Sequence, residues 1–341
     1  MPWFRDWQSP LGARLRTLVV LELVVTVVLS VVAESPLGGS TAAPTWLHLG
    51  TAGSTAGSVL PPAGELGAPT LAAARKRKRH KLLAAGDIAS CSSSGDEATA
   101  KLLDSLAGKV VTLGDNAYES GTASEFTNCY GPSWGRHKRR TRPAVGNHEY
   151  LTSGASGYFG YFGATAGNSK KGYYSYELGA WHIVALNSNC SQVGGCGPGS
   201  PQVTWLRQDL KAHPTKCTLA YWHHPRFSFG NYGNDTLTQS LWQALYDNDA
   251  EIVLSGHDHN YQRWKLLNGA ADHDPNGIRQ FVVGTGGKSH YGLKTPPANV
   301  EKSNDDTFGV LQLTLRATSY DWKFVPVAGK SFTDTGSTSC H

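Results

Sequence analysis

The sequence carries no net charge over most of its length. Residues 1–81 contain 9 of the 31 Lys/Arg and 4 of the 26 Asp/Glu. From residue 82 onward there are therefore 22 basic and 22 acidic residues. A nucleic-acid-binding surface needs clustered positive charge, so no specific nucleic-acid partner is expected. The sequence also lacks the closely spaced cysteine pairs of Cys-rich zinc sites, and it has no nucleophilic Ser or Cys motif.

Charged residues are few, at 17%, whereas hydrophobic residues make up 40% of the 341 positions. This composition can build a real core and excludes both a disordered chain and a coiled coil. The length is about that of two average domains.

Residues 1–33 have the pattern of a targeting segment. Arginines at positions 5, 14 and 16 precede an apolar run over 18–33, which ends in small residues. This order predicts a signal peptide. The alternative is an uncleaved membrane anchor, because the run is near the short limit for spanning a bilayer. Both interpretations predict a secreted or extracytoplasmic protein.

Residues 34–81 predict a linker that precedes one catalytic domain over 82–341. The linker is rich in Gly, Ala, Pro, Ser and Thr without periodicity, so it cannot bury enough apolar surface to fold. It ends in a basic run over 75–81. That run is either a solvated charged segment, a contact for an anionic surface, or a processing site.

All six cysteines follow the linker, and an even count in an exported domain predicts disulfides. Cys190 and Cys196 flank a short loop that contains two glycines, so they are the easiest pair to close. The pairing of the other four stays open; these are Cys91, Cys129, Cys217 and Cys340.

Strand and helix patterns alternate from residue 81 and then give way to strands alone. Strands are predicted over 81–85, 109–113, 181–186, 218–222, 251–254, 279–283, 309–315 and 319–325, and helices over 96–106, 202–212 and 238–247. The pattern indicates an α/β or α+β sandwich, in which two packed sheets have helices outside.

Five short motifs of polar side chains stand at strand ends, and in four of them a glycine precedes the polar residues. The motifs are Gly86-Asp87, Gly114-Asp115-Asn116-Ala117-Tyr118, Gly146-Asn147-His148-Glu149, His223-His224 and Gly256-His257-Asp258-His259. Sites assemble where strands end in open α/β sheets, and glycine allows the chain to turn sharply there. Each motif alone is a common loop; their joint order is far more specific.

This ordered set resembles the calcineurin-like metallophosphoesterases over essentially all of 82–341, and in detail the purple acid phosphatase branch. The resemblance implies a four-layer αββα sandwich of two mixed sheets flanked by helices. Most other branches have a ligand His where this chain has Ala89, and Tyr118 replaces that ligand here. The purple acid phosphatase branch usually has Gly at position 89, a small-for-small difference.

The resemblance also implies two metal ions. One would be held by Asp87, Asp115, Tyr118 and His259, and the other by Asp115, Asn147, His223 and His257, with Asp115 bridging. Carboxylate and phenolate are hard donors that suit Fe(III), whereas imidazoles and an amide suit Zn(II), Mn(II) or Fe(II).

A dinuclear centre of this kind predicts an exported phosphatase that hydrolyses small phosphate monoesters by attack of a metal-bound hydroxide. His148 is the first candidate to orient phosphate and protonate the leaving oxygen, followed by His224 and Tyr232. Relatives often have a histidine near the position of Tyr232, so the identity of the acid stays open. The alternatives are a phosphodiesterase or nucleotidase on the same scaffold, and a non-catalytic metal-binding surface protein.

Overall fold

A computed structural model of the chain describes residues 79–341. The predicted targeting segment (1–33) and nearly all of the predicted linker (34–81) lie outside these residues. Within 79–341, every predicted strand and helix is present, with ends that differ from the prediction by no more than 1 residue.

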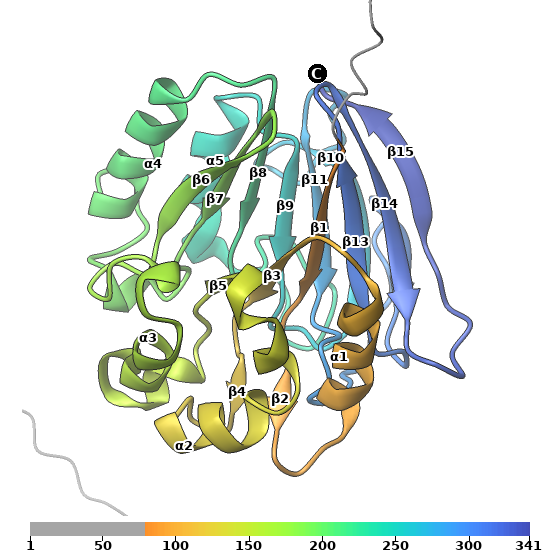
Figure 1. Cartoon of the computed structure of the whole chain (residues 1–341). Helices are drawn as coiled ribbons and strands as arrows, with labels where there is room; N and C mark the ends of the chain where they lie inside the picture. The colour runs from red at the N-terminus through yellow and green to blue at the C-terminus, as the bar shows by residue number, and fades with distance from the viewer. Residues whose placement is uncertain (1–78) are drawn as a thin grey trace, which may run out of the picture. The chain divides into compact units, whose positions relative to one another are not determined.

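Two mixed sheets form the body of the fold (Figure 1). The first has the spatial order β15 (Thr335–Ser339), β14 (Ser319–Pro326), β13 (Gly309–Leu315), β1 (His80–Ala85), β3 (Lys109–Leu113) and β5 (Thr141–Ala144). β1, β3 and β5 are parallel, whereas β13 pairs antiparallel with β1 and β14, and β14 antiparallel with β15.

The second sheet has the order β12 (Val300–Asn304), β10 (Tyr261–Leu267), β11 (Ile278–Val283), β9 (Ile252–Ser255), β8 (Cys217–Tyr221), β7 (Trp181–Ala185) and β6 (Tyr174–Leu178). Its four central strands are parallel, and β6, β10 and β12 are antiparallel to their neighbours. A third, two-stranded sheet pairs β2 (Ala89–Ser90) with β4 (Ala117–Tyr118).

Two apolar cores hold the layers together, because alternate residues of a strand point to opposite faces. Fully buried side chains of both sheets meet in the first core, among them Leu83, Val111 and Leu254. On the other face of the seven-stranded sheet, Val184 and Ala220 pack against α4 (Pro201–Ala212) and α5 (Gln239–Tyr246) in the second core. The predicted sandwich with outer helices is therefore confirmed.

The remaining helices lie toward the end of the molecule where β2 and β4 are seen (Figure 1). They are α1 (Gly95–Ser105), α2 (Ala123–Glu125) and α3 (Ser156–Phe162), with short 3₁₀ or π segments at Phe126–Tyr130, Trp134–Arg140, Glu149–Leu151, Ser153–Ala155, Gly163–Ala166, Cys190–Gln192 and Thr236–Thr238. No helix within 79–341 is long and apolar enough to cross a membrane.

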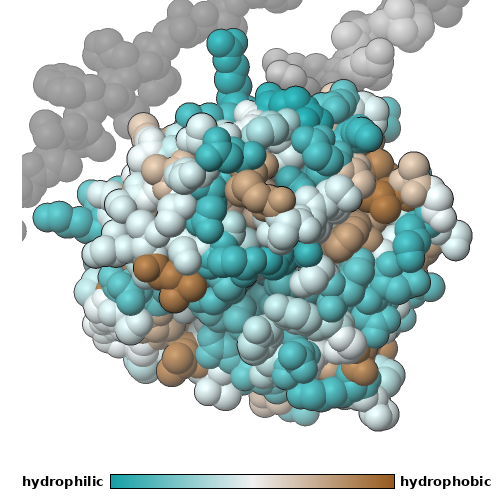
Figure 2. Space-filling model, turned by 90° about the horizontal axis from the view of Figure 1, so that it is seen from below, coloured by the Kyte–Doolittle hydropathy of each residue, from teal (hydrophilic) through white to brown (hydrophobic). Residues whose placement is uncertain are grey.

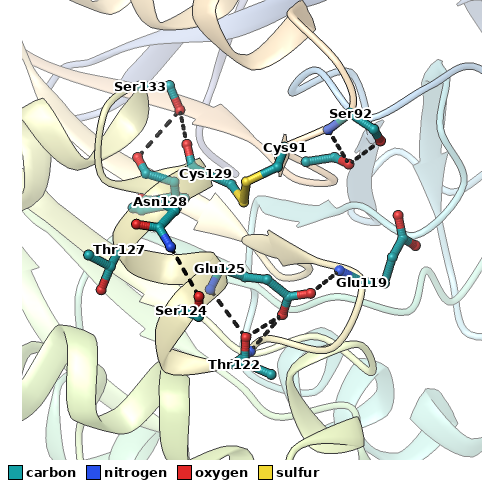
Figure 3. The surroundings of a disulfide bond; sticks show 12 residues. Cys91, Ser92, Glu119, Thr122, Ser124, Glu125, Thr127, Asn128, Cys129 and Ser133 are labelled. Atoms are coloured by element: carbon teal, nitrogen blue, oxygen red, sulfur yellow. Dashed lines mark hydrogen bonds between the residues drawn. A yellow bond between two sulfur atoms is a disulfide. The ribbon is translucent and has the colours of Figure 1, made fainter.

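Three disulfides link the six cysteines, and the predicted Cys190–Cys196 bond is one of them. Cys91–Cys129 joins the loop after β2 to the turn of helix that follows α2 (Figure 3). Cys217–Cys340 joins the start of β8 in one sheet to the chain end beyond β15 in the other. The bonds therefore brace both the loops at one end and the two sheets against each other.

Candidate metal centre

The predicted site residues meet at the carboxyl ends of parallel strands from both sheets. Asp87 follows β1, Asp115 follows β3 and Asn147 follows β5 in one sheet, while His223 and His257 follow β8 and β9 in the other. The short pair β2 and β4, which flanks these loops, marks this end of the molecule in Figure 1.

Four predicted ligands form a tight cluster around the Tyr118 hydroxyl. That oxygen lies 3.0 Å from Asp87 Oδ1, 3.0 Å from Asp115 Oδ2 and 3.2 Å from His259 Nε2. His259 Nε2 is also 3.3 Å from Asp87 Oδ1. A single hydroxyl proton cannot satisfy two carboxylates at once, so the cluster has more acceptor atoms than donors.

A second cluster surrounds His223 Nε2. It lies 2.9 Å from Asn147 Oδ1, 3.2 Å from Asp115 Oδ2 and 3.2 Å from His257 Nδ1. His223 Nδ1 contacts the Leu113 carbonyl at 2.8 Å, and a carbonyl can only accept, so Nδ1 carries the proton. Burial lowers the pKa of His223, but the Asp115 carboxylate outweighs it and raises that pKa to about 9, so Nε2 also carries a proton. A cation in place of that proton would meet Nε2 and two oxygen atoms, an arrangement that suits a metal ion.

Asp115 Oδ2 belongs to both clusters and so links them. Asp87, Asp115, Tyr118, His223 and His259 are all buried, and His257 and Asn147 are half-buried at the opening. Burial and the carboxylates of Asp115 and Asp87 raise the pKa of the Tyr118 phenol well above its usual value. A phenolate here therefore requires a cation in place of the proton.

The glycines before the ligands serve mainly to admit a neighbouring ligand. A Cβ on Gly146 would lie 2.1 Å from Asp115 Oδ1, one on Gly256 would lie 2.6 Å from Asp87 Oδ2, and one on Gly114 would lie 2.5 Å from His223 Nδ1. Only Gly114 also has a positive φ, of 86°. The sharp turn expected from the sequence thus explains Gly114. Gly146 and Gly256 are explained by the ligand side chain that lies where their Cβ would be.

Three of the candidate ligands have strained backbones. Asp87, Asp115 and His257 have φ of 60°, 48° and 70°, a left-handed conformation that side chains other than glycine seldom adopt. Such residues cost free energy and cluster at functional sites, where the surrounding structure over-determines them. Strain at three residues of the two linked clusters indicates that the site is built for a ligand.

Glu149 holds two of the ligand loops together, a role that its place in Gly146-Asn147-His148-Glu149 did not suggest. Its buried carboxylate accepts the backbone N–H groups of Gly146 (2.7 Å), Asp115 (3.1 Å), Asn116 (2.7 Å) and Ala117 (3.3 Å). Burial and the adjacent Asp115 raise its pKa to about 7.

His148, the first candidate for the acid, lies at the rim of the centre. Its Nδ1 is 2.6 Å from the Glu119 carbonyl, so Nδ1 carries a proton and Nε2 is free, 3.8 Å from Asp115 Oδ2. The side chain is 28% exposed and its ring lies against Tyr118. His148 can therefore reach a group bound at the opening.

His224 and Tyr232 lie on the other side, against His257. The His224 ring is 4.5 Å from the His257 ring, and burial together with His223 lowers the pKa of His224 to about 3. A neutral His224 is suited to donate a hydrogen bond, not to supply a proton. Tyr232 is 56% exposed and stacks on the His257 ring at 4.1 Å.

Two serines that the sequence analysis missed orient histidines of the site. Ser289 Oγ lies 2.8 Å from His259 Nδ1, which leaves Nε2 facing Asp87, and Ser188 Oγ lies 2.8 Å from His224 Nδ1. No local signal identifies them, because each contacts its histidine from a distant part of the chain. Partners of this kind fix ring orientation at metal centres.

A pocket of about 450 Å³ opens beside Asn147 and His224. Its wall includes Ser188, the Cys190 loop and two exposed leucines, Leu151 and Leu237. Figure 2 views the molecule from below relative to Figure 1 and shows a face that is mostly hydrophilic with separate hydrophobic patches. The pocket offers room for the part of a substrate that extends from the centre.

Comparisons with known proteins agree with this geometry. The family model for calcineurin-like phosphoesterase matches residues 80–261, which is more than half of the chain. The chain belongs to the calcineurin-like phosphoesterase family. Every candidate ligand up to His259 lies in the matched segment of this phosphoesterase.

The relatives named below are purple acid phosphatases, one branch of the family. Purple acid phosphatase 15 of Arabidopsis thaliana is 25% identical over 215 residues, which are 52% of this chain and 40% of the relative. Purple acid phosphatase 21 of the same plant is 30% identical over 148 residues, 40% of this chain and 32% of the relative. The phosphoesterase thus spans well under half the length of these relatives.

The solved structure of purple acid phosphatase PPD1 from yellow lupin (Lupinus luteus) seeds aligns with a TM-score of 0.62 at 18% identity. The alignment covers 77% of this chain and 54% of the lupin chain. At this identity the likeness establishes the fold, and it confirms the predicted metallophosphoesterase sandwich.

Proposed function

We propose that this phosphoesterase is an exported, two-metal phosphatase that hydrolyses small phosphate monoesters. One observation carries the proposal: Asp115 Oδ2 lies within 3.2 Å of both Tyr118 Oη and His223 Nε2, so one carboxylate joins two groups of ligand atoms. Two cations can together neutralise the oxygens of a phosphate ester, and a shared carboxylate can hold two such ions close together.

The donor chemistry supports a mixed-metal centre. Asp87, Tyr118 and His259, with Asp115, would hold an iron(III) ion, because carboxylate and phenolate are hard anionic donors. The second group would hold zinc, manganese or iron(II), because it offers two imidazoles and an amide; its members are Asp115, Asn147, His223 and His257. When bound, such ions lower the pKa of a coordinated water and withdraw charge from the phosphoryl group.

The chain's own side chains supply the remaining steps. His148 presents Nε2 at the rim, where it can orient a phosphate oxygen and protonate the departing alcohol. Ser188 Oγ accepts the His224 backbone N–H at 3.0 Å and contacts His224 Nδ1, which leaves the His224 Nε2–H free to bind phosphate. Tyr232, exposed on His257, borders the entry.

The proposed catalytic domain is 82–341, and export is part of the proposal. Three disulfides that use every cysteine support an oxidising compartment, since such bonds are rare in the cytosol.

A substrate panel tests the proposal. The purified full chain, loaded with iron and zinc or manganese, should hydrolyse phosphate monoesters faster than diesters. His148→Ala should retain its metals and lose about 100- to 10,000-fold in kcat on an alkyl phosphate, but much less on p-nitrophenyl phosphate, whose phenolate leaves without a proton. Faster turnover of diesters would favour a phosphodiesterase, and no turnover by the metal-loaded protein would contradict the proposal.

A further inference from the structure

A second group of metal-binding side chains lies away from the centre already described. It consists of His182 on β7, and Asp209 and His213 on or just after α4, with one ligand atom from each within 4.8 Å of the others. His182 is paired with Thr218 of β8, five residues before His223. At the rise of a β-strand this separates the two groups by about 16 Å along the sheet.

We propose that His182, Asp209 and His213 bind a divalent transition metal such as Zn²⁺, at a site separate from the catalytic centre. His182 Nε2 lies 2.8 Å from Asp209 Oδ2, and His213 Nδ1 lies 3.5 Å from Asp209 Oδ1. Two imidazoles and one carboxylate are a common zinc ligand set, and they do not suit Mg²⁺ or Ca²⁺, which prefer oxygen.

Neighbouring carboxylate and hydroxyl groups hold His182 and Asp209 in orientations that suit metal binding. Glu177 Oε1 lies 2.7 Å from His182 Nδ1, on the side away from Asp209. This carboxylate fixes the proton on Nδ1 and leaves Nε2 for the metal, as outer carboxylates do at zinc sites. Ser175 Oγ donates to Asp209 Oδ1 at 2.8 Å and so holds the carboxylate in place.

Charge and access also favour a cation. Glu177 and Asp209 give the group a charge of −2 when both histidines are neutral. The group lies at the carboxyl end of α4, where unpaired carbonyls attract positive charge. His182 is buried but the His213 side chain is 44% exposed, so an ion can enter from solvent and keep water as a further ligand.

Binding requires one proton exchange. In the metal-free protein, burial lowers the pKa of His182, but its hydrogen bonds to the Asp209 and Glu177 carboxylates outweigh burial and raise that pKa. The incoming ion forms a bond to Nε2, and the Nε2 proton of the imidazolium passes to the buffer. His213 Nδ1 gives up its hydrogen bond to the Asp209 backbone carbonyl, which is 2.8 Å long; its proton passes to solvent while the exposed Nε2 takes one up, so this ring stays neutral.

Equilibrium dialysis of the full chain tests the site. The metal-stripped protein is dialysed against buffered free Zn²⁺, and zinc per chain is measured by elemental analysis. His213→Ala should hold one equivalent less than the wild type, with unchanged phosphatase activity. The matched control is His273→Ala, because His273 is also exposed and its Nδ1 contacts a backbone carbonyl at 3.1 Å, outside any such group.

A second variant covers the case in which His213→Ala fails to fold. Glu177→Gln keeps all three ligands and should weaken zinc binding at this site about 10- to 100-fold. Equal zinc content and affinity in the wild type and both variants would overturn the proposal. The test compares the zinc content of proteins that share the same catalytic centre. If the proposed two-metal centre fails to bind, zinc per chain falls equally in all of them, and the difference between wild type and variant remains.

Discussion

Replacing the buried Glu149 carboxylate by an amide tests how the ligand loops are held. Its Oε2 accepts the N–H groups of Asp115 and Gly146, and its Oε1 accepts those of Asn116 and Ala117. In Glu149→Gln, one of these oxygens becomes an NH₂ group that cannot accept. Two buried N–H groups then lose their partner, at about 1–3 kcal/mol each.

The expected loss of stability is therefore about 2–6 kcal/mol, a large share of the 5–15 kcal/mol typical of a folded domain. For a domain of this size, Tm should fall by at least about 4 °C, measured by calorimetry at pH 8. Metal affinity should fall as well, because Asp115 and Asn147 lie in the loops that Glu149 joins. The control is Glu97→Gln, an exposed residue whose ion pair with Arg136 contributes little. A Glu149→Gln protein with the wild-type Tm and metal content would refute this role.

Three further predictions concern a glycine in a ligand loop, a disulfide and a buried carboxyl group. Gly146→Ala places a Cβ against Asp115 and should lower kcat/KM at least about 100-fold. The control, Gly160→Ala, should retain activity because nothing lies within 4 Å of its new Cβ. Equal activities of the two variants would contradict the close-approach explanation. Replacing Cys217 and Cys340 by serine opens a loop of 123 residues and should cost about 4–5 kcal/mol in urea denaturation, so an unchanged midpoint would exclude a stabilising bond. Burial raises the pKa of Glu251 from 4.5 to about 8, so the native state keeps a proton that the unfolded state releases. The contribution of Glu251 to the free energy of unfolding is therefore full below pH 4.5. Between pH 4.5 and pH 8 it decreases by at most about 1.4 kcal/mol per pH unit. Glu251→Gln should lack that decline, and identical pH profiles of the two proteins would show that Glu251 does not cause it.

The sequence predicted most of the interior strands of the two large sheets. It missed the edges and also β10, an interior strand whose sequence YQRWKLL alternates apolar and polar residues only in part. β15, β5, β12 and β6 are the four edge strands of the two large sheets, and none was predicted. An edge strand has one neighbour and is less buried, so its sequence lacks a continuous apolar signal: β12 reads VEKSN and β15 reads TGSTS. β5 even contains Pro143, which an edge tolerates.

The candidate ligands were predictable for a different reason. Each follows a strand or lies in a short motif, so order along the chain already gives the set that the fold brings together. The residues that orient them come from contacts between distant segments, such as Ser289 with His259. The group of His182, Asp209 and His213 joins a strand to a helix 27 residues away, and no local pattern marks it.

Metal content of Asp115→Asn tests the two-metal centre most directly. Because Asp115 Oδ2 contacts both groups of ligands, its loss should weaken both metals together. The purified full-length variant should hold close to two equivalents of metal fewer than the wild type by elemental analysis, with activity lost in parallel. A variant that keeps both ions, or loses only one and remains active, would contradict the shared carboxylate on which the proposed function rests.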